Sequence, residues 1–218
     1  MILSGIDFFD VDHTLTMRSS GRHFIIMGIR KGIFPFKYIF SIPFYYIYYR
    51  FGNIKGNLME QGFPQLKGIK QETLENLSRE TFSRRLVYDI YPDAKILINN
   101  LKQQGREIVF ATSSLSIIVK PLAEYLKVEK IIANTLEYEN GECTGAFEKA
   151  PIFGKSKMER VLEFIKDRGF SPSDCSFYSD SIHDLPLLEA IGIPVAVNPD
   201  FRLKKVAKAR GWKIINFR

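Results

Sequence analysis

Short apolar runs alternate with amphipathic segments over the last two thirds of the chain. Uninterrupted apolar stretches predict strands buried on both faces, and apolar positions spaced three or four apart predict helices between them. The expected strands cover residues 3–9, 106–111, 130–134, 175–179, 193–197 and 212–215, and the expected helices cover 93–104, 116–128, 155–168, 185–190 and 201–209. This alternation predicts an α/β fold with a Rossmann-like, doubly wound parallel sheet.

Two segments depart from the alternation. Residues 136–149 hold an Asn140-Gly141 pair between β-type residues, which predicts a small β-hairpin. Residues 17–89 lack buried-strand patterns and contain an aromatic run, residues 33–51, in which ten of nineteen positions are Phe or Tyr. We therefore predict a catalytic core of residues 1–16 and 90–218, interrupted by a helical cap of residues 17–89.

Cysteine content, early acidic residues and net charge limit where the protein is expected to act and what it is expected to bind. Two cysteines are too few for a disulfide framework, and early acidic residues disagree with a secretory signal, so we expect a cytoplasmic protein. The net charge of +7 is compatible with a solvated basic surface or with an anionic partner, namely a phosphate substrate, a nucleic acid or an anionic membrane.

Polar side chains gather where the predicted strands end. Ligands of parallel sheets bind at the carboxyl ends of the strands, so these residues are expected to meet at one edge. They are Asp10 and Asp12, Thr112 to Ser114, Asp180 and Asp184, joined by Lys155 and Lys157 at the start of the helix at 155–168. Clustered carboxylates suit Mg²⁺, and a hydroxyl and a lysine beside them suit a phosphoryl group. An aspartate can then act as the covalent nucleophile.

Four stretches, in order, resemble the motifs of the haloacid dehalogenase-like phosphohydrolases. They are FFDVDHTLT, IVFATSS, GKSKMERV and YSDSIHDLPLLEAIGIPVAVNPD, and with their spacing the resemblance covers residues 5–215. One such motif is weak support, whereas four on successive strand ends are specific. The chain is most similar to the phosphoserine-phosphatase-like branch of this family, which carries a helical cap between its first two motifs.

The resemblance implies a role for each matching residue. Asp10 would be the nucleophile and Asp12 the general acid and base. Mg²⁺ would be held by Asp10, the backbone carbonyl of Asp12 and Asp180. Phosphate would be bound by Thr112, by Ser113 through its backbone amide, and by Lys157. Asp184 would orient Lys157 and a water bound to the metal, without contacting the metal itself.

The chain also departs from the family pattern. Ser179 replaces a glycine, which we expect to be tolerated. Lys155 and Lys157 both compete for the lysine position, and Lys157 fits the helix register better. The stretch TMRSS, residues 16–20, lacks the acid that grips the ammonium of phosphoserine in the phosphatases of that branch.

These observations favour a Mg²⁺-dependent phosphatase acting on a small phosphometabolite or a lipid phosphate. A phosphotransferase or mutase with the same site, and a non-catalytic anion or membrane binder, stay as alternatives, and no nucleic acid is expected. The aromatic run fits cap packing, peripheral membrane contact or a membrane span, so membrane association remains an alternative to a purely cytoplasmic location.

Overall fold

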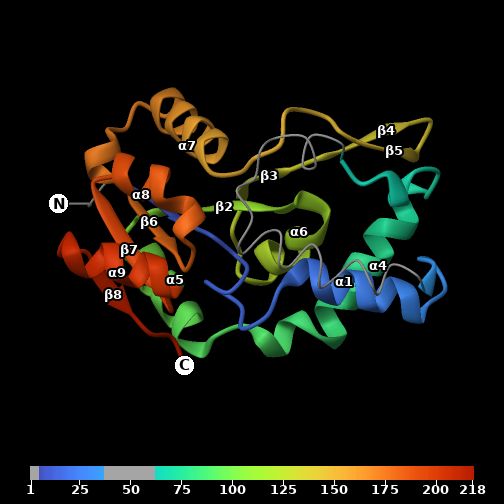
Figure 1. Ribbon diagram of the computed structural model, residues 1–218, viewed down its shortest axis with the longest axis horizontal. Coiled ribbons are helices and arrows are strands. Elements are labelled where there is room, and N and C mark those ends of the chain that lie inside the picture. Colours follow the sequence, from blue (N-terminus) through green and yellow to red (C-terminus); the bar gives the residue numbers. More distant parts are fainter. Residues whose placement is uncertain (1–4, 37–61) are drawn as a thin grey trace.

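The computed structural model of the chain describes residues 5–36 and 62–218 (Figure 1). A parallel sheet forms its centre, with strand order β3-β2-β1-β6-β7-β8. The strands are β1 (Ile6–Phe9), β2 (Glu107–Leu115), β3 (Lys130–Asn134), β6 (Ser176–Ser179), β7 (Ile193–Val197) and β8 (Lys213–Ile215). The predicted doubly wound parallel sheet is confirmed.

Helices cover both faces of this sheet. The α-helices are α1 (Ser20–Arg30), α4 (Gln71–Arg84), α5 (Pro92–Gln103), α6 (Ser116–Tyr125), α7 (Lys155–Asp167), α8 (Leu185–Ala190) and α9 (Phe201–Ala209). Single 3-10 turns are η2 (Pro64–Leu66), η3 (Leu86–Asp89), η4 (Pro172–Asp174) and η5 (Ile182–Asp184). Within the described residues, no helix is both long and apolar enough to span a lipid bilayer.

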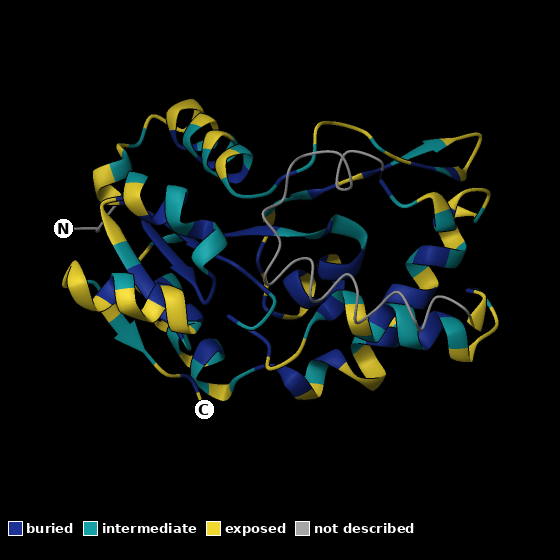
Figure 2. Cartoon of the chain, in the orientation of Figure 1, coloured by how far each residue is buried: buried dark blue, intermediate teal, exposed yellow. Residues whose placement is uncertain are grey.

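Alternating side chains of the central strand supply two separate cores. Phe9 faces the core covered by α5 and α6, whereas Phe8 faces the core covered by α7, α8 and α9. Both rings are fully buried, and the central strands β1 and β6 are buried at every position (Figure 2). A strand covered on both faces is mostly apolar, which explains the apolar runs in the sequence.

A third core lies at the end of the molecule away from β8. It joins Phe24 of α1 and Leu74 of α4 to Leu136 and Cys143 of the hairpin β4 (Leu136–Glu139) and β5 (Glu142–Phe147) (Figure 1). The backbone of residues 63–71 bonds along β5, for instance from Cys143 N to the carbonyl of Ile69 at 2.9 Å. The predicted hairpin is present, and it packs against the helical segment.

The strand β2 is longer than the predicted residues 106–111. After an irregularity at Ala111 it pairs again, Leu115 with Asn134 of β3, and α6 begins only at Ser116. A local apolar pattern ends at the polar residues Thr112 to Ser114, so it cannot show that β2 pairs with β3 again at Leu115. The bounds proposed for core and cap stay a prediction, and the aromatic run lies outside the described residues from position 37 onward.

The order of the strands places a crevice at β1. The chain proceeds from β1 to β2 and β3 on one side, then returns to β6, β7 and β8 on the other. Connections that leave in opposite directions open a space at the carboxyl ends of β1 and β6, which is where open α/β sheets bind ligands.

Candidate functional site

A buried lysine from α7 joins the ends of β1 and β6. The Nζ of Lys157 lies 3.1 Å from Oδ1 of Asp10 and 2.7 Å from Oδ1 of Asp184, and all three side chains are at most 4% exposed. Lys155, two residues earlier, leaves 79% of its side chain exposed and pairs with Glu159 at 3.7 Å. The structure therefore brings Lys157, and not Lys155, to the predicted nucleophile.

Burial and charge act against each other in this cluster. Burial raises the pKa of Asp10 to about 7, which Lys157 counteracts and Asp184 and Asp12 reinforce. Burial lowers the pKa of Lys157, but the carboxylates of Asp10 and Asp184 outweigh it and raise that pKa overall. The lysine is therefore a fixed cation, placed to compensate the carboxylates and any anion that joins them.

Asp180 stands at the end of β6, on the other side of the crevice. Its Oδ1 accepts a hydrogen bond from the hydroxyl of Thr14 at 3.2 Å, and the backbone N–H of Asp180 donates to that hydroxyl at 3.0 Å. Burial, with the charges of Asp10 and Asp184, raises the pKa of Asp180 well above its usual range. Loop residues after β1 and β6 thus hold each other in place.

Ser179 has a structural role at the position where the family has glycine. Its hydroxyl donates to Oδ2 of Asp184 at 2.6 Å and accepts the backbone N–H of Ser181 at 3.2 Å. Asp184 is thereby held on one oxygen by Ser179 and on the other by Lys157. The serine at this position is therefore a hydrogen-bond donor to the lysine's partner, which its small size alone did not indicate.

Asp12 turns toward β2 and α1. Its Oδ2 accepts from the hydroxyl of Ser114 at 2.7 Å, and its Oδ1 accepts from the backbone N–H of Ser20, the first residue of α1, at 2.7 Å. The hydroxyls of Ser20 and Ser114 are themselves 3.3 Å apart. We assigned no role to Ser114 from the sequence, although its position directly after Thr112 and Ser113 placed it near the predicted site.

The predicted phosphate-binding residues lie in the irregular part of β2. Thr112 is 1% exposed, and its Oγ1 accepts the backbone N–H of Ser114 at 3.2 Å. The carbonyl of Ser113 accepts from the side chain of Asn134 at 2.6 Å. The backbone of this stretch is therefore fixed from both sides, at the same sheet edge as Asp10.

Asp7, the third carboxylate near the start of the chain, does not belong to the site. It is fully buried within β1 and pairs with Arg106, whose second nitrogen lies 3.2 Å from Oδ1 of Asp7. A buried carboxylate needs such a partner, so we assign Asp7 and Arg106 a role in stabilising the fold.

The oxygen donors near Asp10 suit a divalent cation. In residues 5–36 and 62–218, no group of three or more His, Cys, Asp or Glu side chains is arranged as a metal cage. Asp10 and Asp180 nonetheless each have a raised pKa, and Asp10 contributes repulsion to the shift of Asp180, so a cation between them would relieve both. A site with two carboxylates completed by carbonyl, water and phosphate oxygens is typical of Mg²⁺.

Comparison with known proteins places the chain in a family. The family model described as haloacid dehalogenase-like hydrolase matches residues 8–189. A histidinol-phosphatase of Neisseria meningitidis serogroup C is 32% identical, over 70% of this chain and 71% of that protein. A solved protein of unknown function from Bordetella pertussis Tohama I has a TM-score of 0.87 and 27% identity, covering 97% of this chain and 98% of that one.

A structure of a phosphoserine phosphatase, titled as a phospho-aspartyl intermediate analogue, shares the fold. Its TM-score is 0.65 at 18% identity, covering 97% of this chain and 92% of that one. The family suggested by the four sequence motifs is confirmed, because its model covers most of the chain. The chain belongs to the haloacid dehalogenase-like hydrolases.

Proposed function

We propose that this hydrolase is a Mg²⁺-dependent phosphatase that cleaves a phosphate monoester through an aspartyl-phosphate on Asp10. The observation that carries the proposal is the position of Lys157, buried between Asp10 and Asp184 at 3.1 and 2.7 Å. A lysine held at the nucleophile neutralises its charge and that of an incoming phosphate, which lowers the repulsion between two anions.

In the first step, a carboxylate oxygen of Asp10 attacks phosphorus while the bond to the ester oxygen breaks. Asp12 delivers a proton to that leaving oxygen, and the alcohol departs. Thr112 and the backbone N–H of Ser113 bind the phosphoryl oxygens, because they follow the part of β2 that pairs with β1. Ser114 and the start of α1 hold the carboxyl of Asp12 in its orientation.

In the second step, Asp12 takes a proton from water, whose oxygen attacks phosphorus and releases Asp10 and inorganic phosphate. Lys157 remains charged throughout, because the carboxylates of Asp10 and Asp184 raise its pKa. Mg²⁺ bound by Asp10, Asp180 and the carbonyl of Asp12 would supply additional positive charge beside the phosphoryl group.

The substrate we propose is a small phosphate ester. The related proteins named histidinol-phosphatase and phosphoserine phosphatase support phosphatase chemistry. The stretch after Asp12 offers Arg18, paired with Asp89 at 2.7 Å, and no acid for an amino-acid ammonium. We propose that residues 17–89 form a cap that selects the rest of the substrate, and a lipid phosphate stays the second substrate class because of the aromatic run at 33–51.

The test compares Asp10→Asn with the wild type on an aryl phosphate in the presence of Mg²⁺. We expect the substitution to lower kcat by at least about a thousandfold, since no nucleophile remains. Acid quenching with labelled substrate should trap phosphate on the wild type and none on the variant. Asp174→Asn, which changes an exposed carboxylate, is the matched control and should leave kcat unchanged. An Asp10→Asn protein with near-normal turnover would refute the mechanism.

Two further measurements separate the alternatives. Added alcohol acceptors should leave the release of inorganic phosphate unchanged, whereas a phosphotransferase would convert part of it into a new ester. A panel of small phosphate esters and lysophospholipid phosphates distinguishes the two substrate classes. A purified protein without metal-dependent turnover of any of them would instead support a non-catalytic binder.

A further inference from the structure

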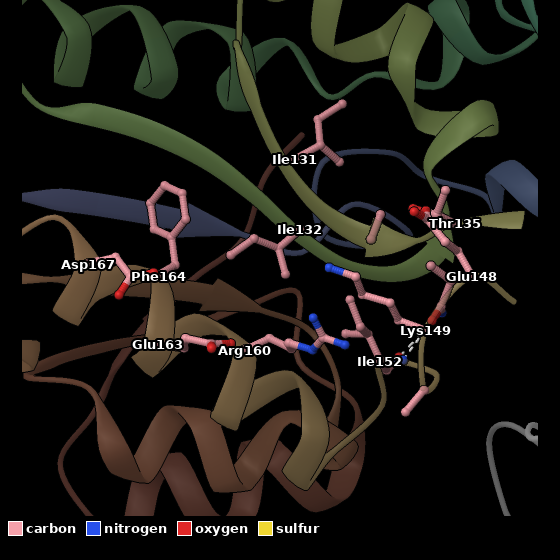
Figure 3. Close-up of a pocket in the computed structure, with 13 residues that line it drawn as sticks. Ile131, Ile132, Thr135, Glu148, Lys149, Ile152, Arg160, Glu163, Phe164 and Asp167 are labelled. Atoms are coloured by element: carbon pink, nitrogen blue, oxygen red, sulfur yellow. Dashed lines mark hydrogen bonds between the residues drawn. The ribbon is translucent and has the colours of Figure 1, made fainter.

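A cavity of about 310 Å³ lies beside β3, at the edge of the sheet. Its walls are β3, the chain at residues 148–152 and the helix α7 (Figure 3). Asp10, Asp12, Lys157, Asp180 and Asp184 do not line it. Its volume is at the small end of the range for ligand pockets, so it suits a small molecule. Because it is separate from Asp10, this molecule would not be the substrate.

Two basic side chains enter the cavity from different walls. Lys149 extends from the chain after β5 and Arg160 from α7, and their charged ends point toward one another (Figure 3). Neither side chain forms an ion pair or hydrogen bond with another described residue, and Lys149 is exposed whereas Arg160 is partly buried. Two facing cations repel each other, and an anion between them removes that repulsion.

The rest of the lining restricts the kind of anion. Ile132, Ile152 and Phe164 contribute apolar surface, and the ring of Phe164 is fixed edge-on to Phe8 with centroids 6.0 Å apart. Three acidic residues also line the cavity: Glu148 directly precedes Lys149 in the sequence, and Glu163 and Asp167 lie at the other end from Lys149 (Figure 3). A long polyanion would meet Glu163 and Asp167, whereas a compact molecule with one anionic group and an apolar body could stay beside Lys149 and Arg160.

We propose that this cavity binds a small organic anion, with its phosphate, phosphonate or carboxylate group between Lys149 and Arg160 and its apolar part against Ile132, Ile152 and Phe164. The proposal is independent of the reaction at Asp10. It assigns a second ligand site to the edge of the sheet.

Asn134 and its hydrogen bond to the Ile152 amide provide NMR signals that can report on ligand binding in the cavity. Asn134 lines it and is 4% exposed. Its Oδ1 accepts the backbone N–H of Ile152 at 2.6 Å, and its side-chain nitrogen donates to the carbonyl of Ser113 at 2.6 Å. An occupant therefore changes the surroundings of the Ile152 amide and of the Asn134 side-chain amide.

The test is a nitrogen-15 NMR titration of the full chain with phenylphosphonate, which joins a doubly charged head to an apolar ring. We expect saturable shifts at the amides of Ala133 and Ile152, whereas the Asn134 side chain, bonded to Ser113, also responds to binding near Asp10. Lys149→Ala with Arg160→Ala should weaken this binding by at least about tenfold, since bonds to charged groups are each worth that much or more. The matched control is Lys166→Ala with Lys208→Ala, which removes two exposed charges outside the cavity and should leave the affinity unchanged.

Two other probes test the two halves of the site. Inorganic phosphate should bind about tenfold more weakly than phenylphosphonate, because it buries no apolar surface. Neutral benzamide should not saturate the cavity signals at the same concentrations. The proposal is overturned if these signals do not shift, if they shift equally in the Lys149/Arg160 variant, or if shifts are confined to the residues around Asp180. Signals near Asp180 report separately on the proposed function.

Discussion

The hydroxyl of Ser114 donates a 2.7 Å hydrogen bond to Oδ2 of Asp12, across 102 positions of sequence. Together with the N–H of Ser20 on the other oxygen, it holds the carboxyl group that we propose as acid and base. Ser114→Ala removes one of these two restraints. We expect kcat to fall about tenfold on alkyl phosphates, which corresponds to one hydrogen bond to a charged group.

The leaving group distinguishes this positioning role from a general loss of structure. A p-nitrophenyl leaving group needs little protonation, so Ser114→Ala should lower its kcat by no more than about threefold. Ser116→Ala, at the start of α6, serves as the matched control and should affect neither substrate. Equal losses on both substrates would contradict the role assigned to Ser114.

Lys157 is expected to support both the fold and the reaction. Lys157→Met leaves Asp10 and Asp184 buried without their cation, so unfolding in denaturant should show a loss of about 3–5 kcal/mol. Turnover should be lost as well. Lys155→Met, at an exposed side chain, should change stability by less than about 1 kcal/mol. A stable Lys157→Met protein would mean that the pair with Asp10 contributes nothing to folding.

Asp180 is expected to destabilise the metal-free protein at neutral pH. Its pKa is raised in the folded state, mainly by burial, so the folded protein holds that proton more firmly than the unfolded chain. Stability from this group is therefore lost as pH rises above about 4, the pKa of a free aspartate. With a chelator present, Asp180→Asn should melt a few degrees higher than the wild type at pH 7, and the gain should vanish near pH 4.

Magnesium should make the wild type melt at a higher temperature than Asp180→Asn. Adding Mg²⁺ is expected to raise the melting temperature of the wild type and to have no effect on Asp180→Asn, because the variant lacks a charged ligand. Asp174→Asn provides a control at an exposed carboxylate, and its response should match the wild type. A variant that responds to Mg²⁺ as strongly as the wild type would exclude Asp180 as a ligand.

Ser179→Gly converts this chain to the residue usual in its family, and we expect it to be harmful here. The substitution removes the 2.6 Å hydrogen bond to Asp184 and the acceptor for the N–H of Ser181. Urea unfolding should show a loss of about 1–3 kcal/mol, with a reduced kcat because Lys157 loses a fixed partner. Ser173→Ala, at an exposed serine, should leave both unchanged, and a Ser179→Gly enzyme of normal stability would show that the bond is dispensable.

Local apolar patterns were sufficient for the class of fold. Strands at residues 130–134 and 193–197 and helices at 185–190 and 201–209 were predicted with the bounds that the structure has. Such segments are determined locally, because strands of a covered sheet are mostly apolar and a surface helix is apolar on one side. Asp10 and Asp180 followed from the same pattern, since they stand directly after β1 and β6.

Contacts between distant segments could not be predicted in this way. The continuation of β2 to Leu115 depends on Asn134 of β3. Lys157 was preferred to Lys155 from the helix register, but its contacts with both Asp10 and Asp184 depend on how α7 packs on the sheet. The proximity of Lys149 and Arg160 could not be predicted either, because only tertiary packing brings the chain after β5 beside α7.

By itself, the sequence determined which segments are strands and helices and which polar residues end them, because these depend on neighbours a few positions apart. The tertiary structure alone decided which of those residues meet. Ser114 reaches Asp12, and Ser179 reaches Asp184, only once the parallel strands β1, β2 and β6 align their carboxyl ends. Hydrogen bonds and ion pairs act over about 3 Å, so the fold must be complete before they exist.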